Sequence, residues 1–515
     1  MIGQSSSVPR PFEKLIESVP DAELRQPGSR LVESVHFDSR DVIPGACFVC
    51  RQGLRNDGHA YVSRAIDMGA IAIVAERPVS VPAHVGLALV PDGRIALAGL
   101  SRKFWGEPDL EIGTIGITGT DGKTTTSHLV AGLLKAQGSR VGSMTTVDVQ
   151  FNGESRPSER RLTTPEAPWI AQQLRRMVDS GGGWGVIEVA SHALELQRVH
   201  GFAFDRAVVT NVTRDHLDVH GGIAEYRRAK RRLIDLLDAT AHTSWGRVAI
   251  LNADDPVASG FAEHTDCDVV TFGVHRRADV RVLWHECDVA RARVTVESPW
   301  GRWDVPTKLV GSWNASNIAA AVATVGSITG TLDDAMEMLP GMSAVSGRME
   351  AIDCGQPFRV IVDFAHTPAA LKAVLSELRA QTSGRIISVF GSAGDQDKGK
   401  RPLLGRVVAM YADYAVVTDE DPRGEDPELI AEAIVAGASA TRPGFAMDVV
   451  LDRREAIRKA LLSACPGDAV VLTGKGHETG IAYSGFTVPW NEAAEARKAL
   501  VEAGYDDPNP PGRSS

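Results

Sequence analysis

The stretch that decides the fold of the middle of the chain is residues 112–126, IGTIGITGTDGKTTT. A β-branched run enters a glycine turn, and Lys123 then opens an amphipathic segment that continues to about Gln137. This order of strand, turn and helix predicts a phosphate-binding loop, because backbone N–H groups of the turn and the helix N-terminus attract anions. The strict GxxxxGK[ST] pattern fails, since Ile117 occupies its first glycine position. We predict nucleotide binding here; the alternative is a glycine-rich turn with a solvated lysine.

Further apolar runs follow this loop, with room for a helix between them, at residues 185–189, 207–211 and 248–252. Strands that alternate with helices predict a parallel, doubly wound sheet. Residues 267–306 instead alternate apolar and polar positions with little helix signal. There we expect a small antiparallel insertion, followed by a helix that begins near Asn314.

The flanking parts of the chain have their own strand and helix patterns. Short apolar runs occur before the loop at residues 45–49, 70–75 and 86–90, and after it at residues 358–362, 386–390, 414–418 and 469–473. We therefore predict an α/β protein of three domains. These are a small N-terminal α/β domain (1–107), a central P-loop-type domain with a mostly parallel sheet (108–344) and a C-terminal Rossmann-like domain (345–515).

Composition excludes several classes of protein. The chain has 515 residues, of which 43% are hydrophobic and 23% charged, and no apolar run approaches the roughly 18 residues that span a bilayer. Residues 1–11 lack the pattern of a signal peptide, so we expect a cytoplasmic protein without membrane insertion. The net charge of −10 argues against a nucleic-acid partner. Six cysteines are too few for a disulfide framework, and the CxxC of Cys47 and Cys50 has no second pair at zinc spacing.

Polar residues follow two of the central strands. Glu188 ends one apolar run, and Asp215 and His216 follow the next. In a parallel sheet these residues reach the same edge as the loop, where a carboxylate, an imidazole and the Thr124 hydroxyl can place Mg²⁺ on ATP. Ordinary helix caps are the alternative.

Several motifs together resemble the Mur ligase family. Residues 119–125, GTDGKTT, match the family's GTxGKT[TS], which folylpolyglutamate synthetases share. Residues 188–192 (EVASH), 211–218 (NVTRDHLD) and 226–230 (YRRAK) match further motifs in family order. The resemblance extends from Asp38 to about Leu500 and implies an ATP-dependent, amide-bond-forming ligase of peptidoglycan synthesis.

The resemblance also assigns roles to residues that sequence patterns alone leave open. It implies that ATP is bound by Gly119, Thr120, Asp121, Gly122, Lys123, Thr124, Thr125, Asn314, Asn317 and Asp363. It implies that Mg²⁺ is held by Thr124, Glu188, His216 and a carbamylated Lys230, and that Lys123, Lys230 and Arg348 are catalytic. From the residues alone, Lys230 reads as a solvated lysine and the two asparagines as helix caps.

Other motifs resemble the members that attach a diamino acid to UDP-N-acetylmuramoyl-L-alanyl-D-glutamate. Residues 38–40 (DSR) and 163–166 (TTPE) match their nucleotide-peptide segments. The substrate contacts implied are Ser39, Thr163, Thr164, Ser191 and Arg198. The resemblance implies an acyl-phosphate intermediate, and we expect a monomer. A folylpolyglutamate-type ligase and a non-ligase P-loop nucleotide-binding module are the rival interpretations.

The incoming amino acid is expected in the third domain. The residues implied are Gln396, Glu420, Asp421, Arg423, Gly474 and Glu478. Arg423 favours meso-2,6-diaminopimelate, since a guanidinium can clamp a distal carboxylate. Diaminopimelate-adding members carry Asp-Asn-Pro-Arg, whereas residues 420–423 read EDPR, and Gln396 stands where those members have an arginine. L-ornithine and L-lysine therefore remain open as substrates.

Overall fold

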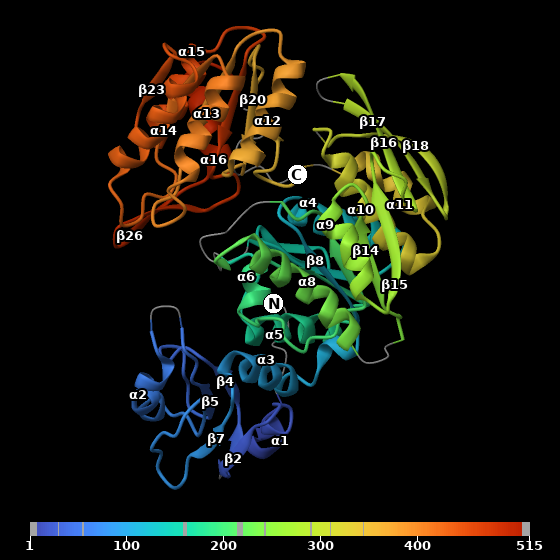
Figure 1. Ribbon diagram of the computed structural model, residues 1–515, viewed down its shortest axis with the longest axis vertical. Helices are drawn as coiled ribbons and strands as arrows, with labels where there is room; N and C mark the ends of the chain where they lie inside the picture. Colours follow the sequence, from blue (N-terminus) through green and yellow to red (C-terminus); the bar gives the residue numbers. More distant parts are fainter. Residues whose placement is uncertain are drawn as a thin grey trace.

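The computed structural model describes residues 8–28, 30–53, 56–157, 162–213, 220–240, 244–288, 291–309, 311–342 and 344–506. Three sheets, each covered by helices, follow one another along the molecule, with the N-terminal sheet at one end and the C-terminal sheet at the other (Figure 1). This confirms the predicted three-part α/β fold. None of the helices among these residues is long and apolar enough to cross a membrane.

The N-terminal sheet has the strand order β2-β7-β6-β5-β4. Its strands are β2 (Glu23–Gln26), β4 (Ser34–His36), β5 (Ala46–Val49), β6 (Ala72–Ala75) and β7 (Gly86–Leu89), and only the β2–β7 pairing is antiparallel. Helices α1 (Phe12–Ile16) and α3 (Gly93–Phe104) pack on one face and α2 (Val62–Asp67) on the other. A short pair, β1 (Arg10–Pro11) and β3 (Leu31–Val32), lies beside this sheet, and β4 forms its edge.

The central sheet has the order β11-β10-β9-β12-β8-β13-β14-β15-β16-β17-β18. Its strands are β8 (Gly113–Thr118), β9 (Val141–Met144), β10 (Asp148–Phe151), β11 (Glu154–Pro157), β12 (Trp184–Glu188), β13 (Arg206–Val209), β14 (Val248–Asn252), β15 (Asp268–Gly273), β16 (Val280–Asp288), β17 (Arg291–Ser298) and β18 (Gly301–Thr307). Pairing is parallel from β9 to β16 through the middle of the sheet and antiparallel at both ends.

Helices cover both faces of this sheet. Helices α4 (Lys123–Ala136), α10 (Asn314–Thr329) and α11 (Asp333–Met338) share one core, and α5 (Ala167–Asp179) and α8 (Ile223–Ala239) share the other. Two short helices, α6 (Ser191–Glu195) and α9 (Pro256–Gly260), follow β12 and β14. The predicted helix start at Asn314 is confirmed.

The prediction of a small antiparallel insertion at residues 267–306 is confirmed for β16 to β18, which pair antiparallel, and is wrong for β15. β15 pairs in parallel with β14, and β16 to β18 continue the central sheet instead of forming their own. Val282 and Val294 belong to the same core as α10, which explains the alternating pattern. The apolar face packs on a helix of the central unit, while the other face stays polar.

The C-terminal sheet has the order β19-β20-β24-β21-β22-β23 and is parallel except for β19. Its strands are β19 (Glu350–Ala351), β20 (Arg359–Asp363), β21 (Ile386–Phe390), β22 (Tyr414–Val417), β23 (Met447–Val449) and β24 (Ala469–Thr473), with a hairpin of β25 (Gly480–Tyr483) and β26 (Phe486–Pro489). The helices are α12 (Pro368–Gln381), α13 (Lys400–Tyr411), α14 (Pro427–Thr441), α15 (Arg453–Ser463) and α16 (Glu492–Glu502). The Rossmann-like prediction is confirmed, while the domain boundaries stay predictions.

Candidate functional site

The predicted phosphate-binding loop has the expected geometry. It joins the end of β8 at Thr118 to the start of α4 at Lys123. Gly122 has a φ of 82°, and a Cβ at this position would lie 2.4 Å from Asn317 Oδ1. The turn therefore requires glycine. Lys123 Nζ donates to the carbonyl oxygens of Gly119 (3.0 Å) and Thr120 (2.9 Å), so its charge lies over the loop.

A buried carboxylate stands beside the loop. Glu188, the last residue of β12, accepts hydrogen bonds from Thr124 Oγ1 at 2.9 Å and from Thr146 N and Oγ1 at 2.8 and 3.0 Å. Within the described residues, no three His, Cys, Asp or Glu side chains gather as a metal site. One carboxylate beside a P-loop hydroxyl nevertheless fits Mg²⁺, which binds through few protein groups plus substrate phosphates.

Lys230 is buried at the same loop and is not a solvated lysine. Its side chain on α8 is 1% exposed, and Nζ donates to Gly119 O at 2.6 Å. The amine also lies 4.8 Å from the ring centroid of Tyr226, whose hydroxyl is 2.9 Å from Thr120 Oγ1. The sequence motif thus brings a lysine and a tyrosine of α8 onto the phosphate loop.

The two predicted asparagines pack against the same loop. Asn317 Nδ2 donates to Asn314 Oδ1 at 2.8 Å, and Asn317 Oδ1 lies 3.4 Å from Thr126 Oγ1 on α4. Thr125 lies in the first turn of α4. Asp121 N donates to Asn211 Oδ1 at 2.9 Å, a contact the sequence did not single out.

The third unit presents a carboxylate and a guanidinium toward this loop. Asp363, at the end of β20, accepts from Met349 N (2.8 Å) and Ala365 N (2.7 Å). Burial raises the pKa of Asp363, and the charge of Asp121 on the P-loop adds to that rise. Arg348 stacks on Phe364, with its guanidinium carbon 4.6 Å from the ring centroid. The predicted ATP-binding residue Asp363 and the predicted catalytic residue Arg348 are therefore neighbours, and the Arg348 charge acts on the Asp363 carboxylate.

Two glycines make a close backbone contact where the third unit begins. Gly347 has a φ of 68°, and a Cβ there would lie 2.2 Å from His477 N. A Cβ at Gly476 would lie 2.8 Å from Gly347 O. Neither position has room for a side chain. Burial lowers the pKa of the adjacent His477 to about 3, and the positive charges of Arg348 and Lys475 contribute, so this imidazole is neutral at pH 7.

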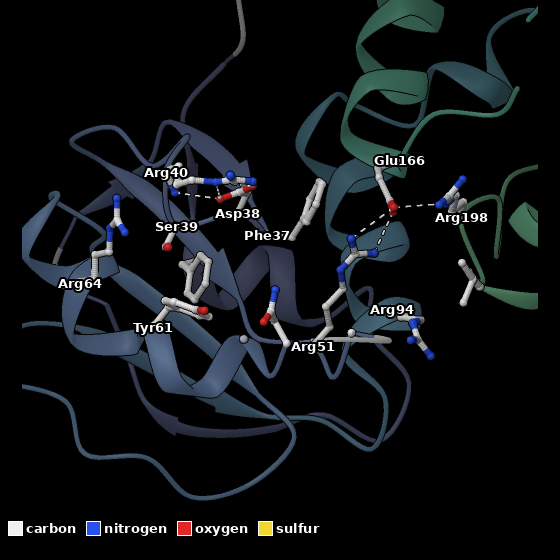
Figure 2. Close-up of a pocket in the computed structure, with 15 residues that line it drawn as sticks. Phe37, Asp38, Ser39, Arg40, Arg51, Tyr61, Arg64, Arg94, Glu166 and Arg198 are labelled. Carbon is white, nitrogen blue, oxygen red and sulfur yellow. Dashed lines mark hydrogen bonds and ion pairs between the residues drawn. The ribbon is translucent and has the colours of Figure 1, made fainter. Parts of the chain in front are cut away.

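A cavity of about 590 Å³ lies between the N-terminal and central units (Figure 2). Ser39 and Arg198, two of the predicted substrate contacts, line it from the N-terminal and the central unit. Four further arginines line the cavity, namely Arg40, Arg51, Arg64 and Arg94. Such a density of guanidinium groups suits a diphosphate. Arg40 belongs to the motif at residues 38–40 that the sequence singled out, whereas Arg51, Arg64 and Arg94 were missed, although Arg51 follows β5 by two positions, where functional side chains of α/β folds concentrate.

A carboxylate joins the two sides of this cavity. Glu166 accepts from Arg51 Nη1 at 2.9 Å and Nη2 at 3.2 Å, and it lies 3.1 Å from Arg198 Nε (Figure 2). Arg198 Nη1 donates to Thr164 O at 2.9 Å, and burial lowers the pKa of Arg198. Thr164 Oγ1 in turn donates to Glu188 O at 2.8 Å. A continuous set of contacts therefore runs from the arginine cavity to the phosphate loop.

Ser191, another predicted substrate contact, lies close to Tyr226 of the phosphate-loop region through His220. Its hydroxyl is 3.1 Å from His220 Nε2, and the His220 ring packs edge-on against Tyr226 with centroids 5.3 Å apart. Thr163 precedes the buried Thr164. His216, the predicted metal ligand, lies outside the described residues.

The predicted amino-acid residues gather around an unpredicted lysine. Lys475, fully buried, donates to Asp421 Oδ1 at 2.9 Å and also bonds Glu478. Burial raises the pKa of Glu478. A Cβ at Gly474 would lie 2.9 Å from Glu420 Oε2, so the glycine lets that carboxylate approach.

The other two predicted amino-acid residues stand apart from this lysine. Arg423, with a φ of 56°, donates its N–H to Ala482 O at 2.9 Å. Gln396 is exposed, and its Oε1 lies 3.4 Å from Lys400 Nζ. Within the described part of the chain, no contact joins Gln396 to Arg423 or Glu478.

Comparison with known proteins covers all three units. Family models match in chain order: "Mur ligase family, catalytic domain" at residues 31–105, "Mur ligase middle domain" at 117–325 and "Mur ligase, glutamate ligase domain" at 347–476. A UDP-N-acetylmuramyl-tripeptide synthetase of Roseiflexus sp. is 44% identical, covering 92% of this chain and 95% of the relative. A UDP-N-acetylmuramoyl-L-alanyl-D-glutamate--2,6-diaminopimelate ligase of Geobacillus thermodenitrificans is 38% identical, covering 95% and 99%.

A solved structure of a UDP-N-acetylmuramoyl-L-alanyl-D-glutamate--2,6-diaminopimelate ligase superposes with a TM-score of 0.65 at 28% identity, covering 96% of this chain and 99% of that one. The family models lie on the three sheets described above, and the relatives match almost the whole chain. The chain belongs to the Mur ligase family.

Proposed function

We propose that this protein is an ATP-dependent ligase that joins meso-2,6-diaminopimelate to UDP-N-acetylmuramoyl-L-alanyl-D-glutamate in peptidoglycan synthesis. The names of its relatives in Geobacillus and of the superposed structure support this reaction. The observation that carries the proposal is the set of contacts from the arginine cavity through Glu166, Arg198 and Thr164 to Glu188 beside the phosphate loop. A substrate with a diphosphate at one end and a carboxylate at the other fits this path.

In this mechanism the D-glutamyl carboxylate oxygen attacks the γ-phosphorus of ATP, and ADP leaves. The amine of the diamino acid then attacks the acyl carbon, phosphate leaves and the nitrogen loses a proton. Lys123 neutralises phosphate charge at the loop, and Arg348 approaches from the third unit. The enzyme supplies alignment and charge stabilisation, which are the main contributions in phosphoryl transfer.

Thr124 and Glu188 are the residues that would hold Mg²⁺, and we assign His216 and a carbamate on Lys230 as further ligands. The ion, when bound, supplies a positive charge that the phosphates share. The burial of Lys230 and its 2.6 Å hydrogen bond to Gly119 O support a role at the loop. In the same proposal Asn314, Asn317 and Asp363 contact the nucleoside of ATP.

For the amino acid, we propose that Glu420 accepts the distal amine. Within the described residues, Glu420 Oε2 is buried and has no hydrogen-bond partner, whereas Asp421 and Glu478 already bond Lys475. Arg423 would clamp a distal carboxylate. The exposed Gln396 supplies no charge for that carboxylate, and this observation keeps L-lysine or L-ornithine as the second candidate.

The testing experiment measures ADP release and product mass with ATP, Mg²⁺ and UDP-N-acetylmuramoyl-L-alanyl-D-glutamate. Meso-diaminopimelate, L-lysine and L-ornithine are supplied in separate reactions. Turnover with diaminopimelate, and a mass gain of one diaminopimelyl residue, is the expected result. Turnover with only lysine or ornithine would reassign the substrate. ADP release without any mass gain would refute the ligase.

A Lys230→Ala variant tests the carbamate. We expect loss of turnover and partial recovery with added short-chain carboxylates, whereas Lys459→Ala, on an exposed lysine of α15, should keep full activity. Unchanged turnover in Lys230→Ala would remove this lysine from the mechanism.

A further inference from the structure

A second cavity, of about 610 Å³, shares three lining residues with the arginine cavity. Its walls come from the segment around the edge strand β4, from the end of α3 and from the first turns of α5. Phe37, Asp38 and Glu166 line both cavities and therefore form the partition between them. The volume is within the range of small-molecule sites. The mechanism proposed above leaves this cavity unused.

Aromatic rings line much of the second cavity. Phe104 and Trp105 close α3 and pack edge to face, with ring centroids 5.3 Å apart. Trp169 contributes from α5 and Phe37 from the partition. Phe37 already stacks against a cation from the arginine side, because the Arg51 guanidinium carbon lies 4.1 Å from its ring centroid. Such rings attract cations through their π faces.

The charged groups of this cavity are mostly carboxylates. Asp38 and Glu166 are neutralised by arginines of the first cavity, through Arg40 for the former and Arg51 and Arg198 for the latter. Glu33 and Asp41 line only the second cavity and are exposed. Across the described ranges, neither of these two carboxylates forms an ion pair.

One permanently charged cation, Arg176, lines the cavity and can balance part of the negative charge of these carboxylates. Arg176 on α5 donates from Nη1 to Gln173 Oε1 at 3.3 Å. His36 also lines the cavity, but burial lowers its pKa, so this imidazole is uncharged at pH 7 despite the opposing influence of Asp41. Arg40, which is ion-paired to Asp38, also interacts with the charge of Asp41, so the three carboxylates Glu33, Asp38 and Asp41 face one arginine and the charge at this end stays negative.

We propose that the second cavity binds a small organic ammonium ion with an apolar body. The ammonium group lies at Glu33 and Asp41, and the apolar body packs between Trp105 and Trp169. A carboxylate ligand of the same shape should bind more weakly because Glu33 and Asp41 repel it. A neutral ligand should also bind more weakly, because it forms neither ion pairs nor cation–π contacts.

The test is isothermal titration calorimetry of the full-length protein with three probes of matched shape, namely phenethylammonium, phenethyl alcohol and phenylacetate. We expect phenethylammonium to bind saturably and at least about fivefold more tightly than the alcohol, which corresponds to two cation–π contacts at the low end of their range. We expect no saturable binding of phenylacetate. Equal binding of all three probes, or no binding of phenethylammonium, overturns the proposal.

Amino-acid substitutions test whether phenethylammonium binds in the second cavity. Glu33→Gln combined with Asp41→Asn should weaken phenethylammonium binding about tenfold, while the matched pair Asp334→Asn and Glu432→Gln, on exposed carboxylates of α11 and α14, should leave it unchanged. Circular dichroism confirms that each variant is folded.

A different location of the probe is also detectable. The amino-acid residues of the third unit include carboxylates, so Glu478→Gln is tested in parallel. Loss of phenethylammonium binding in Glu478→Gln, with retention in the Glu33 and Asp41 variant, would place the probe in the third unit and overturn the proposal.

Discussion

The two cavities that share the Phe37, Asp38 and Glu166 partition have nearly the same volume and opposite charge. The first has five arginines and suits a diphosphate, whereas the second has two unneutralised carboxylates and four aromatic rings. The difference arises because, apart from the shared residues, the first cavity is lined from β5, α2, α3 and the segment after α6, whereas the second is lined from β4, the end of α3 and α5. It teaches that burial and size say little about a ligand until the charges of a cavity are assigned.

The largest expected effect concerns the arginine side. Arg51→Ala should weaken binding of a UDP-sugar probe, UDP-N-acetylglucosamine, roughly 10- to 100-fold, because a charge-assisted hydrogen bond is lost and Glu166 keeps only Arg198 of its two arginine partners. Calorimetry measures the affinity. Arg442→Ala, which removes another arginine stacked on a phenylalanine, is the control and should change nothing. If phenethylammonium affinity fell as much as that of the UDP-sugar, the two cavities would not be distinct.

The next effect concerns the aromatic side. Trp169→Leu should weaken phenethylammonium binding about tenfold through the loss of a cation–π partner and apolar contact. The same variant should bind the UDP-sugar as the unaltered protein does, because Trp169 lines only the second cavity. Titrations of both probes on one preparation give the comparison. A parallel loss of both affinities would mean that the variant disturbs α5 as a whole.

A smaller effect is expected of a ligand in one cavity on the affinity for a ligand in the other. A cation in the second cavity attracts Glu166 and weakens its hold on Arg51 and Arg198, which then turn to the diphosphate. Saturating phenethylammonium should tighten UDP-sugar binding about fivefold, and the UDP-sugar should tighten phenethylammonium binding by the same factor. Glu166→Gln should abolish the coupling in both directions. Unequal factors in the two directions would indicate that one probe enters both cavities.

The smallest effect depends on pH. Because burial holds the His36 pKa below its ordinary value of 6.5, the imidazole is mostly neutral at pH 7 and above and gains a positive charge as the pH falls below 6.5. Phenethylammonium affinity should therefore be constant in the upper range and fall about threefold toward pH 5, the scale of a partly exposed charge pair. His36→Gln should flatten the profile. The UDP-sugar, titrated alongside, should show no step attributable to His36.

The sequence predicted the parts of the site that depend on local patterns. The loop from Gly119 to Thr124 is a strand, turn and helix in direct succession, and Glu188 follows its strand at the same sheet edge, so both could be placed before the structure was known. Only the family motif implied a role for Lys230 in the site. The helix pattern predicted a solvated lysine, because a charged residue in a helix does not show which loop packs against it.

The second cavity could not be predicted in the same way. Its walls lie at residues 33–43, 104–105 and 166–176, which no repeat or spacing connects, and they meet only because two units pack together. Arg51, Arg64 and Arg94 of the first cavity escaped notice for the same reason. The role of residues 268–307 as an extension of the central sheet was missed because alternation along a strand does not say which sheet it joins.

The backbone contact between Gly347 and Gly476 has a mechanical consequence. The turn at Gly347 packs closely on the turn at Gly476, Met349 N donates to Asp363 of β20, and β19 pairs with β20, so we expect the residues after Gly347 to move with the C-terminal sheet. Any swing of that sheet toward the phosphate loop must pivot at a point before Gly347. Arg348 is then carried by the moving piece, and its approach to the γ-phosphate reports directly how far the hinge has turned.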